Sequence, residues 1–241
     1  MINLIKARIT HGYQAIPNPL KTGIHPSFPG RPEIESDADL SPLIPLCPTG
    51  AISEKGIDLG LCVFCGLCQR TAPETIRFMP DFKIAADSRE KLIIAPGQKE
   101  MPKITSPMPR LTRRSFAMRN VSAGGCNACE QELGASSNVN FDIGRYGIEV
   151  EASPRHTDAL ILTGPISKNM AYALLETYKS IPKPKFIILC GTCAISGGSF
   201  ADSDQIDRSF IESFEVQLYI PGCPAHPLSI VHAIHSFMGA K

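Results

Sequence analysis

The apolar runs ALILT at residues 159–163 and FIILC at residues 186–190 decide which fold this chain can form. Each run is short and continuous, a pattern typical of strands that are buried on both faces of a parallel sheet. Residues 170–180 between them predict a helix, and Pro182 and Pro184 end it because proline cannot continue a helix. The centre of the sequence therefore predicts a strand–helix–strand unit.

The flanking segments continue this alternation. Further strands are predicted at residues 148–152 and 216–220, and a helix is predicted at residues 228–238. Strands and helices in alternation predict βαβ units, so we expect residues 111–241 to form an α/β domain with a parallel sheet covered on both faces. In such sheets, ligands bind at the carboxyl ends of the strands.

The N-terminal part has a different composition. Residues 1–45 are rich in Pro and Gly with little periodicity, which predicts an extended arm that lies on a partner. Residues 46–95 carry four cysteines and short strand-like pieces, which predicts a small α+β domain. Residues 96–110 contain four prolines in a polar stretch, so we expect a linker there.

The overall composition narrows the functional class. The 241 residues are 43% hydrophobic with a net charge of +1, which suits a globular protein and gives no electrostatic footprint for nucleic acid. No apolar stretch reaches the roughly 20 residues that span a bilayer, and the first ten residues lack the pattern of a signal peptide, so we expect a cytoplasmic chain. Nine cysteines in that reducing compartment indicate metal binding.

The first cysteine group has the spacing of an iron–sulfur ligand run. In bacterial ferredoxins the run C-x2-C-x2-C-x3-C-P gives three ligands to one cluster, and its fourth Cys binds the other cluster. CVFCGLCQRTAP at residues 62–73 keeps the first three ligands but has Ala72 in place of the fourth, and Cys47-Pro48 is the end of an upstream run. The first three positions of that upstream run would be Asp37, Leu40 and Leu43.

All the missing ligands therefore belong to one cluster. One complete set remains, and it predicts a single [4Fe-4S] cluster: Cys47, Cys62, Cys65 and Cys68. The alternative is zinc, which four thiolates also suit, although the x2, x2 spacing is unusual for zinc modules. Residues 35–85 resemble a bacterial-type ferredoxin domain in a single-cluster form.

A second group of cysteines lies in three separate motifs of the α/β domain. These are GGCNACEQE at residues 124–132, GTC at residues 191–193 and PGCP at residues 221–224. The last two follow predicted strands, so their thiols belong at the carboxyl edge of the sheet. Glycines before the first pair would let the backbone approach an inorganic sulfide, and backbone N–H groups at the start of a helix favour negative charge.

Together these motifs resemble the small subunit of energy-converting, membrane-bound [NiFe] hydrogenases, including formate hydrogenlyase, and the related cluster N2 (20 kDa) subunit of respiratory complex I. The resemblance covers about residues 110–240. It implies a flavodoxin-like fold and a second [4Fe-4S] cluster bound by Cys126, Cys129, Cys193 and Cys223. Complex I subunits have adjacent cysteines in the first motif, whereas the two-residue gap here is that of the hydrogenases.

Some positions near these motifs leave a choice open. Glu132 matches an acidic position that both branches share, or it is a solvated helix carboxylate. Ala128 stands where hydrogenases usually have Gly, and Asn120 where they often have His. Cys190 lies within a predicted strand and is interpreted as a small buried hydrophobe. His226 could tune the cluster through a hydrogen bond or face solvent.

The expected function is that of an electron-transfer subunit with two [4Fe-4S] clusters and no catalytic centre of its own. The resemblance implies a hydrogenase-type large subunit that carries Ni–Fe, membrane subunits, and a donor that is ferredoxin-like or linked to formate or CO dehydrogenase. It also implies a peripheral position on the cytoplasmic side of the membrane. The alternatives are a nickel-free, complex I-like subunit whose complex reduces quinone, and a free two-cluster carrier.

Overall fold

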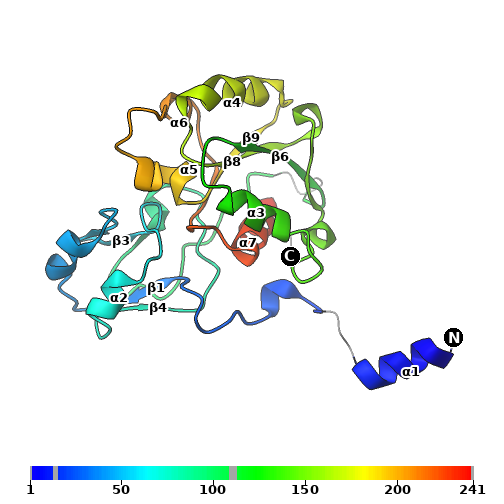
Figure 1. The fold of residues 1–241 in the computed structure, drawn as a ribbon, viewed down its shortest axis with the longest axis horizontal. Helices are drawn as coiled ribbons and strands as arrows, with labels where there is room; N and C mark the ends of the chain where they lie inside the picture. Colours follow the sequence, from blue (N-terminus) through cyan, green and yellow to red (C-terminus); the bar gives the residue numbers. More distant parts are fainter. Residues whose placement is uncertain (1, 13–15, 109–112, 240–241) are drawn as a thin grey trace.

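A five-stranded parallel sheet forms the centre of the computed structural model, which describes residues 2–12, 16–108 and 113–239 (Figure 1). Its strands are β6 (Phe116–Ser122), β7 (Ile148–Val150), β8 (Ala159–Thr163), β9 (Phe186–Cys190) and β10 (Leu218–Ile220). They are ordered β10-β9-β8-β6-β7, and every neighbouring pair is parallel. The α/β class and the parallel sheet predicted from the sequence are confirmed.

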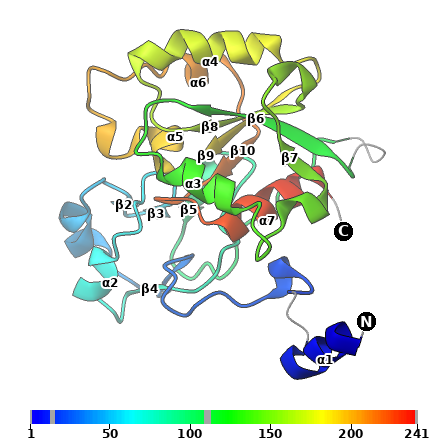
Figure 2. The same cartoon turned by 45° about the vertical axis from the view of Figure 1, so that its right-hand side comes forward.

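Helices cover both faces of the sheet. On one face lie α4 (Lys168–Ser180) and α6 (Ser209–Ser213), and on the other lie α3 (Ala128–Ala135) and α7 (Pro227–Met238) (Figure 2). Successive residues of a strand point to opposite faces, so Leu160 and Leu162 pack in one core and Ile161 packs in the other. This two-sided burial explains why β8 and β9 are continuously apolar.

The strands end in register at one edge of the sheet. Ser122 pairs with Thr163, Thr163 with Cys190, and Cys190 with Ile220. The loops that follow these four residues therefore leave the sheet side by side. The short helix α5 (Thr192–Ser196) begins in one of these loops, directly after β9.

The N-terminal module consists of two small antiparallel sheets with short helices. One sheet pairs β1 (Pro32–Ile34) with β4 (Ile76–Phe78), and the other joins β2 (Ile52–Ser53), β3 (Gly56–Asp58) and β5 (Ile93–Ile94). Its helices are the 3-10 turns η2 (Ser41–Leu46) and η3 (Glu90–Leu92) and the α-helix α2 (Leu67–Thr71). This composition agrees with a small α+β module.

Residues 1–45 differ from the extended arm predicted from the sequence. Helix α1 (Ile2–His11) stands apart from the body and buries none of its residues, but the chain from Ile16 onward packs on its own fold (Figure 1). Arg145 Nη1 donates hydrogen bonds to the carbonyl oxygens of Ile16 and Pro17, both at 3.0 Å. Strand β1 then completes a sheet of the N-terminal module, because its backbone pairs with β4.

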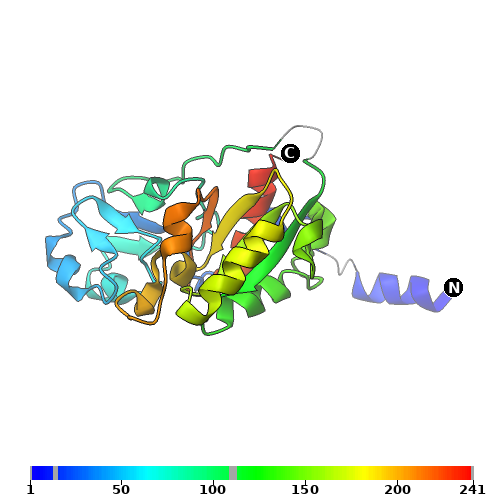
Figure 3. The same cartoon turned by 90° about the horizontal axis from the view of Figure 1, so that it is seen from above.

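The N-terminal module and the sheet share one hydrophobic core. Ile57 and Leu92 of the module belong to the same buried cluster as Leu162 and Leu189 of the sheet. The module lies beside the sheet end where α5 begins (Figures 1 and 3). Residues 96–108 follow the surface between them, whereas residues 109–110 of the predicted linker and the next two residues, 111–112, lie outside the described residues. The domain limits 46–95 and 111–241 remain a prediction.

Direct contacts join the two parts. Ala86 forms an isolated antiparallel bridge with Tyr219 of β10, with backbone hydrogen bonds of 2.8 and 3.0 Å. The hydroxyl of the buried Thr192 donates to the carbonyl oxygen of Cys62 at 2.8 Å. Gly60 is buried against Ile195, and a Cβ on Gly60 would come within 2.9 Å of Ile195 Cγ2.

Replacing Gly60 by Ala tests this close contact. The added methyl group would overlap with Ile195 and the guanidinium of Arg89, so we expect a loss of about 1–3 kcal/mol in the free energy of unfolding, as for other overpacked sites. The matched control is Gly144→Ala, where a Cβ would meet nothing within 4 Å. Anaerobic urea unfolding would measure both, and equal midpoints for the two variants would contradict the close packing.

Candidate functional site

The predicted thiols of the N-terminal module surround one cavity. Cys47 ends η2, Cys62 and Cys65 lie in the loop after β3, and Cys68 lies on α2. All four line the same hollow, together with apolar side chains that include Ile57 and Phe78. The structure therefore brings together the four residues that the sequence grouped.

The backbone of this cavity is shaped to approach sulfur. The N–H of Ala51 donates to Cys47 Sγ at 3.2 Å, and the N–H of Phe64 donates to Cys62 Sγ at 3.3 Å. Phe64 has a φ of 54°, which turns the loop between two of the thiols. Hydrogen bonds from the backbone to sulfur are among the features that tune iron–sulfur centres, so this donor set fits a [4Fe-4S] cluster.

Burial acts differently on the four thiols. Cys62 is buried, Cys47 and Cys68 are half-buried, and Cys65 is exposed. Burial, with smaller contributions from the neighbouring thiols, raises the pKa of Cys62 to about 12. A thiol binds metal as the thiolate, so a metal bound here would have to supply the stabilisation that water does not give at this position.

Apolar side chains occupy three of the four positions of the missing ligands. Leu40 is 2% exposed and Leu43 is 3% exposed, and both belong to the shared core. Ala72 packs against the same core, while Asp37 is exposed. The part of the module that would hold another cluster in a two-cluster ferredoxin is therefore filled with hydrocarbon.

The second group of predicted thiols meets at the carboxyl edge of the sheet. Cys126 lies in the loop after β6, Cys129 on α3, Cys193 on α5 and Cys223 in the loop after β10. Electrostatic interactions link Cys129 to Cys193 and Cys223, and Cys126 to the same two thiols. Burial is the main reason why the pKa of Cys129 rises to about 12.

A glycine after β9 leaves room for one of these thiols. Gly191 has a φ of +92°, and a Cβ at this position would overlap with Cys129 Sγ. Any other side chain would strain the backbone and displace the thiol at the same time. This close approach of backbone to sulfur supports the fit of the four residues to a cluster.

Within the described part of the chain, no three Cys, His, Asp or Glu side chains are placed to hold a single metal ion. In a cubane each thiolate binds a different iron atom, so the four sulfurs stand farther apart than the ligands of one ion.

Arg208 is a half-buried cation beside the second group that the sequence did not reveal. Its guanidinium donates to the carbonyl oxygens of Ala194 and Ile195, both at 2.8 Å, and to that of Pro165 at 3.1 Å. A weaker contact of 3.4 Å reaches the carbonyl oxygen of Cys193. The arginine thus caps the last carbonyl groups of α5 and places a positive charge near Cys193.

Two glutamates lie near the second group in different environments. Glu130 Oε1 accepts hydrogen bonds from the hydroxyls of Ser122 at 2.6 Å and Thr163 at 2.7 Å. Asn120 extends this network, because its Nδ2 lies 3.3 Å from Thr163 Oγ1. Glu132 is half-buried in a hollow that Cys223 also lines, and burial raises its pKa.

Cys190 and His226 both pack against other parts of the fold. Cys190 is fully buried at the end of β9, and burial raises its pKa well above the ordinary value. His226 is half-buried between Phe28 and Phe141, and its Nδ1 accepts a hydrogen bond from the N–H of Leu228, which caps α7. The histidine ring therefore packs against aromatic side chains on two sides.

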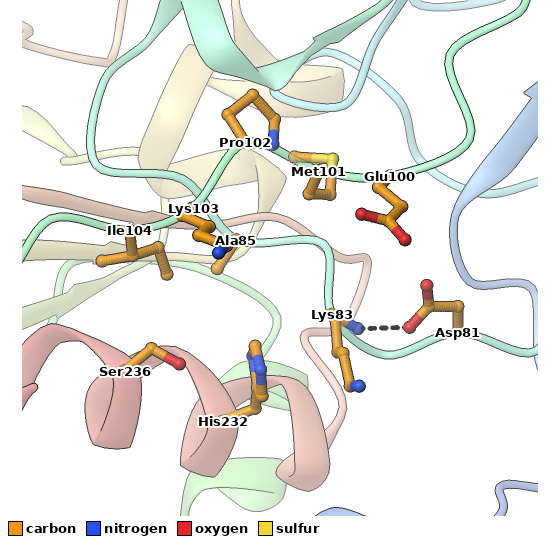
Figure 4. Close-up of a pocket in the computed structure, with 10 residues that line it drawn as sticks. All are labelled: Asp81, Lys83, Ala85, Glu100, Met101, Pro102, Lys103, Ile104, His232 and Ser236. Atoms are coloured by element: carbon orange, nitrogen blue, oxygen red, sulfur yellow. Dashed lines mark hydrogen bonds between the residues drawn. The ribbon is translucent and has the colours of Figure 1, made fainter. Parts of the chain in front are cut away.

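Another hollow lies away from both cysteine groups. Figure 4 shows it between α7 and residues 100–104, with Lys83 and His232 on its wall. The ring of His232 packs against Phe82, and burial lowers its pKa to about 4. The ten residues that line this hollow include no cysteine, so the cluster chemistry belongs elsewhere.

The part of the chain that contains the second cysteine group is similar to known proteins. Residues 126–237 match the family of the NADH ubiquinone oxidoreductase 20 kDa subunit. The probable membrane-bound hydrogenase subunit mbhJ of Pyrococcus furiosus is 30% identical over 137 residues, which are 57% of this chain and 82% of that protein. The chain belongs to this family. Members are subunits of oxidoreductase complexes and bind an iron–sulfur cluster.

Other known proteins are also similar to this chain. Protein MJ0516 of Methanocaldococcus jannaschii is 38% identical over 122 residues, covering 51% of this chain and 82% of that protein. Formate hydrogenlyase subunit 7 of Escherichia coli is 38% identical over 127 residues, covering 53% of this chain and 50% of that protein. A chain in the solved archaeal membrane-bound sulfane sulfur reductase has a TM-score of 0.47 at 25% identity, covering 54% of this chain and 71% of that one.

Replacing Cys190 by Ala tests the choice of ligands. The thiol lies in the apolar core, so its loss should cost about 1 kcal/mol in stability and leave the iron content unchanged. Iron analysis and electron paramagnetic resonance of the reduced protein would measure this, with Cys193→Ala as the ligand-removing comparison. Loss of a cluster signal in the Cys190 variant would mean that Cys190 is a ligand.

Proposed function

We propose that this chain carries electrons through two [4Fe-4S] clusters in an energy-converting hydrogenase complex. One cluster would be held by Cys47, Cys62, Cys65 and Cys68, and the other by Cys126, Cys129, Cys193 and Cys223. Each bound cluster would accept and release one electron at a time. The observation that carries the proposal is the gathering of eight of the nine cysteines into these two groups, from segments far apart in sequence.

The exposure of the thiols supports an order for the electron path. Cys65 is exposed in the first group, whereas Cys126 and Cys223 are exposed in the second. Each group therefore has a side that a partner can approach. We infer that a donor reaches the first group, and that a large subunit with a Ni–Fe centre docks against the second.

The names of the relatives support the partners that we propose. They include a membrane-bound hydrogenase subunit and a formate hydrogenlyase subunit. We therefore propose membrane subunits as further partners, and a donor that is ferredoxin-like or linked to formate or CO dehydrogenase. Among the described helices, none is long and apolar enough to cross a membrane. A peripheral position on the cytoplasmic side is part of the proposal.

A second candidate function is that of a nickel-free, complex I-like subunit whose complex reduces quinone. The observation in its favour is the likeness to an NADH-quinone oxidoreductase subunit of Clostridium beijerinckii, which is 39% identical over 111 residues. The spacing of Cys126 and Cys129, with two residues between them, favours the hydrogenase branch. Nickel analysis of the complex purified through this chain would decide between the two.

The number of clusters can be counted directly. If both groups hold cubanes, anaerobically purified protein should contain about eight iron and eight sulfide per chain. A value near four would remove one site, and zinc in place of iron would reject the proposed chemistry.

The order of the path can be tested with two variants of the complex. Cys65→Ala should damage the first cluster alone, so activity driven by the physiological donor should fail while an artificial donor that reaches the large subunit still supports proton reduction. Cys129→Ala should abolish activity with the physiological donor and with any artificial donor that enters through this chain. Electron paramagnetic resonance of both variants would show which cluster remains.

One result would contradict this linear order. It is equal loss of both activities in the Cys65 variant while the second cluster is still visible by electron paramagnetic resonance. The Cys190→Ala variant serves as the control, because it removes a cysteine without removing an expected ligand.

A further inference from the structure

Thr192 connects backbone segments that belong to both cysteine groups. Its Oγ1 donates to the carbonyl oxygen of Cys62 at 2.8 Å, and its backbone N–H donates to the carbonyl oxygen of Gly222 at 2.9 Å. Oγ1 also lies 3.2 Å from the Gly222 oxygen. Thr192 itself precedes Cys193, and Gly222 precedes Cys223. One side chain therefore meets three segments that carry thiols.

The hydroxyl has one proton, and the geometry indicates where it goes. The contact to the Cys62 oxygen is the shorter of the two, and the Gly222 oxygen already accepts the backbone N–H of Thr192. Thr192 is 0% exposed, so water does not compete for this proton. A hydrogen bond in such a low-dielectric interior is electrostatically stronger than one at the surface.

This hydrogen bond completes a short path between the two groups. The path runs from Cys62 Sγ through its own Cβ, Cα and carbonyl group to the hydroxyl of Thr192, and then along the backbone to Cys193 Sγ. Every other link in it is a covalent bond. Cys62 is also the most buried thiol of the first group, so the path starts on the side away from solvent.

We propose that Thr192 is a positioning residue for electron transfer between the two clusters, acting through its hydrogen bond to the Cys62 carbonyl. This rests on the proposed function, because it requires both clusters. One electron leaves one cluster, which is oxidised by one electron, and enters the other, which is reduced by one. The hydroxyl keeps its proton throughout and fixes the spacing and coupling of the two ligand segments.

The two parts of the fold should remain docked without this hydroxyl. Ala86 and Tyr219 are joined by two backbone hydrogen bonds, and the shared core contains many apolar side chains from both parts. Thr192→Val keeps the shape and the branched Cβ but removes the donor. Its effect on electron transfer can therefore be separated from an effect on folding.

The experiment uses the full chain with both clusters, purified anaerobically and reduced with dithionite. Freeze-quench electron paramagnetic resonance follows the reduction of each cluster, and the fully reduced state reports their magnetic interaction. Thr192→Val should retain the iron content of the unaltered protein while transfer between the clusters slows several-fold and their interaction weakens. Thr192→Ser, which keeps the hydroxyl, should restore both.

The matched control is Thr157→Val. Thr157 is 2% exposed, and its hydroxyl donates to the carbonyl oxygen of Pro154 at 2.9 Å, at the opposite end of the sheet from the thiols. This variant loses a comparable buried hydrogen bond, so any general loss of stability appears in it as well. Its transfer rate and magnetic interaction should equal those of the unaltered protein.

Three results would overturn the proposal. The first is an unchanged transfer rate and magnetic interaction in a Thr192→Val protein with full iron content. The second concerns the case in which Thr192→Val loses a cluster. Thr192→Ala and Thr192→Ser are then compared, and equal rates of electron transfer between the clusters in these two variants reject a role for the hydroxyl. The third is loss of a cluster in both hydroxyl-free variants but not in Thr192→Ser, which would show a structural role alone. A single cluster in the unaltered protein would instead reject the proposed function.

Discussion

The arrangement of both cysteine groups depends on the apolar core that the N-terminal module shares with the sheet. Residues such as Ile57 on one side and Leu189 on the other are removed from water by the same contact. This shared hydrophobic contact fixes the module in one position on the sheet, whereas a flexible tether would only raise its local concentration. The separation of the two groups is therefore set by packing.

Hydrophobic periodicity predicted the centre of the sheet well. Strands β8 and β9 have the predicted bounds, because both faces of these strands are buried and the sequence has no polar interruption there. Strand β6 was missed, since Arg119 and Asn120 break its apolar pattern. The Asn120 amide is accommodated by a hydrogen bond to the carbonyl oxygen of Ile161 on the neighbouring strand, a partner 41 residues away.

The candidate site, like the sheet, was predicted from the sequence only in part. Cysteine spacing grouped the first four thiols, the rule that ligands collect at the carboxyl ends of parallel strands placed Cys193 and Cys223 at one edge, and the family resemblance completed the second group. Thr192 and Arg208 could not be found like this, because their functional environment consists of backbone carbonyl groups. Any residue type can present a carbonyl, and the partner Cys62 is 130 residues from Thr192. Only the packing of the module on the sheet creates that contact.

The apolar side chains at positions where a two-cluster ferredoxin has ligands agree with this dependence on packing. In a free two-cluster ferredoxin, metal–thiolate bonds hold both ends of a small fold that has little core of its own. Here Leu40 and Leu43 replace ligands at one end and join the shared core. That end is therefore stabilised by hydrocarbon contact. The buried Cys62 then lies toward the sheet and the exposed Cys65 toward solvent, which gives one cluster site an inner and an outer side.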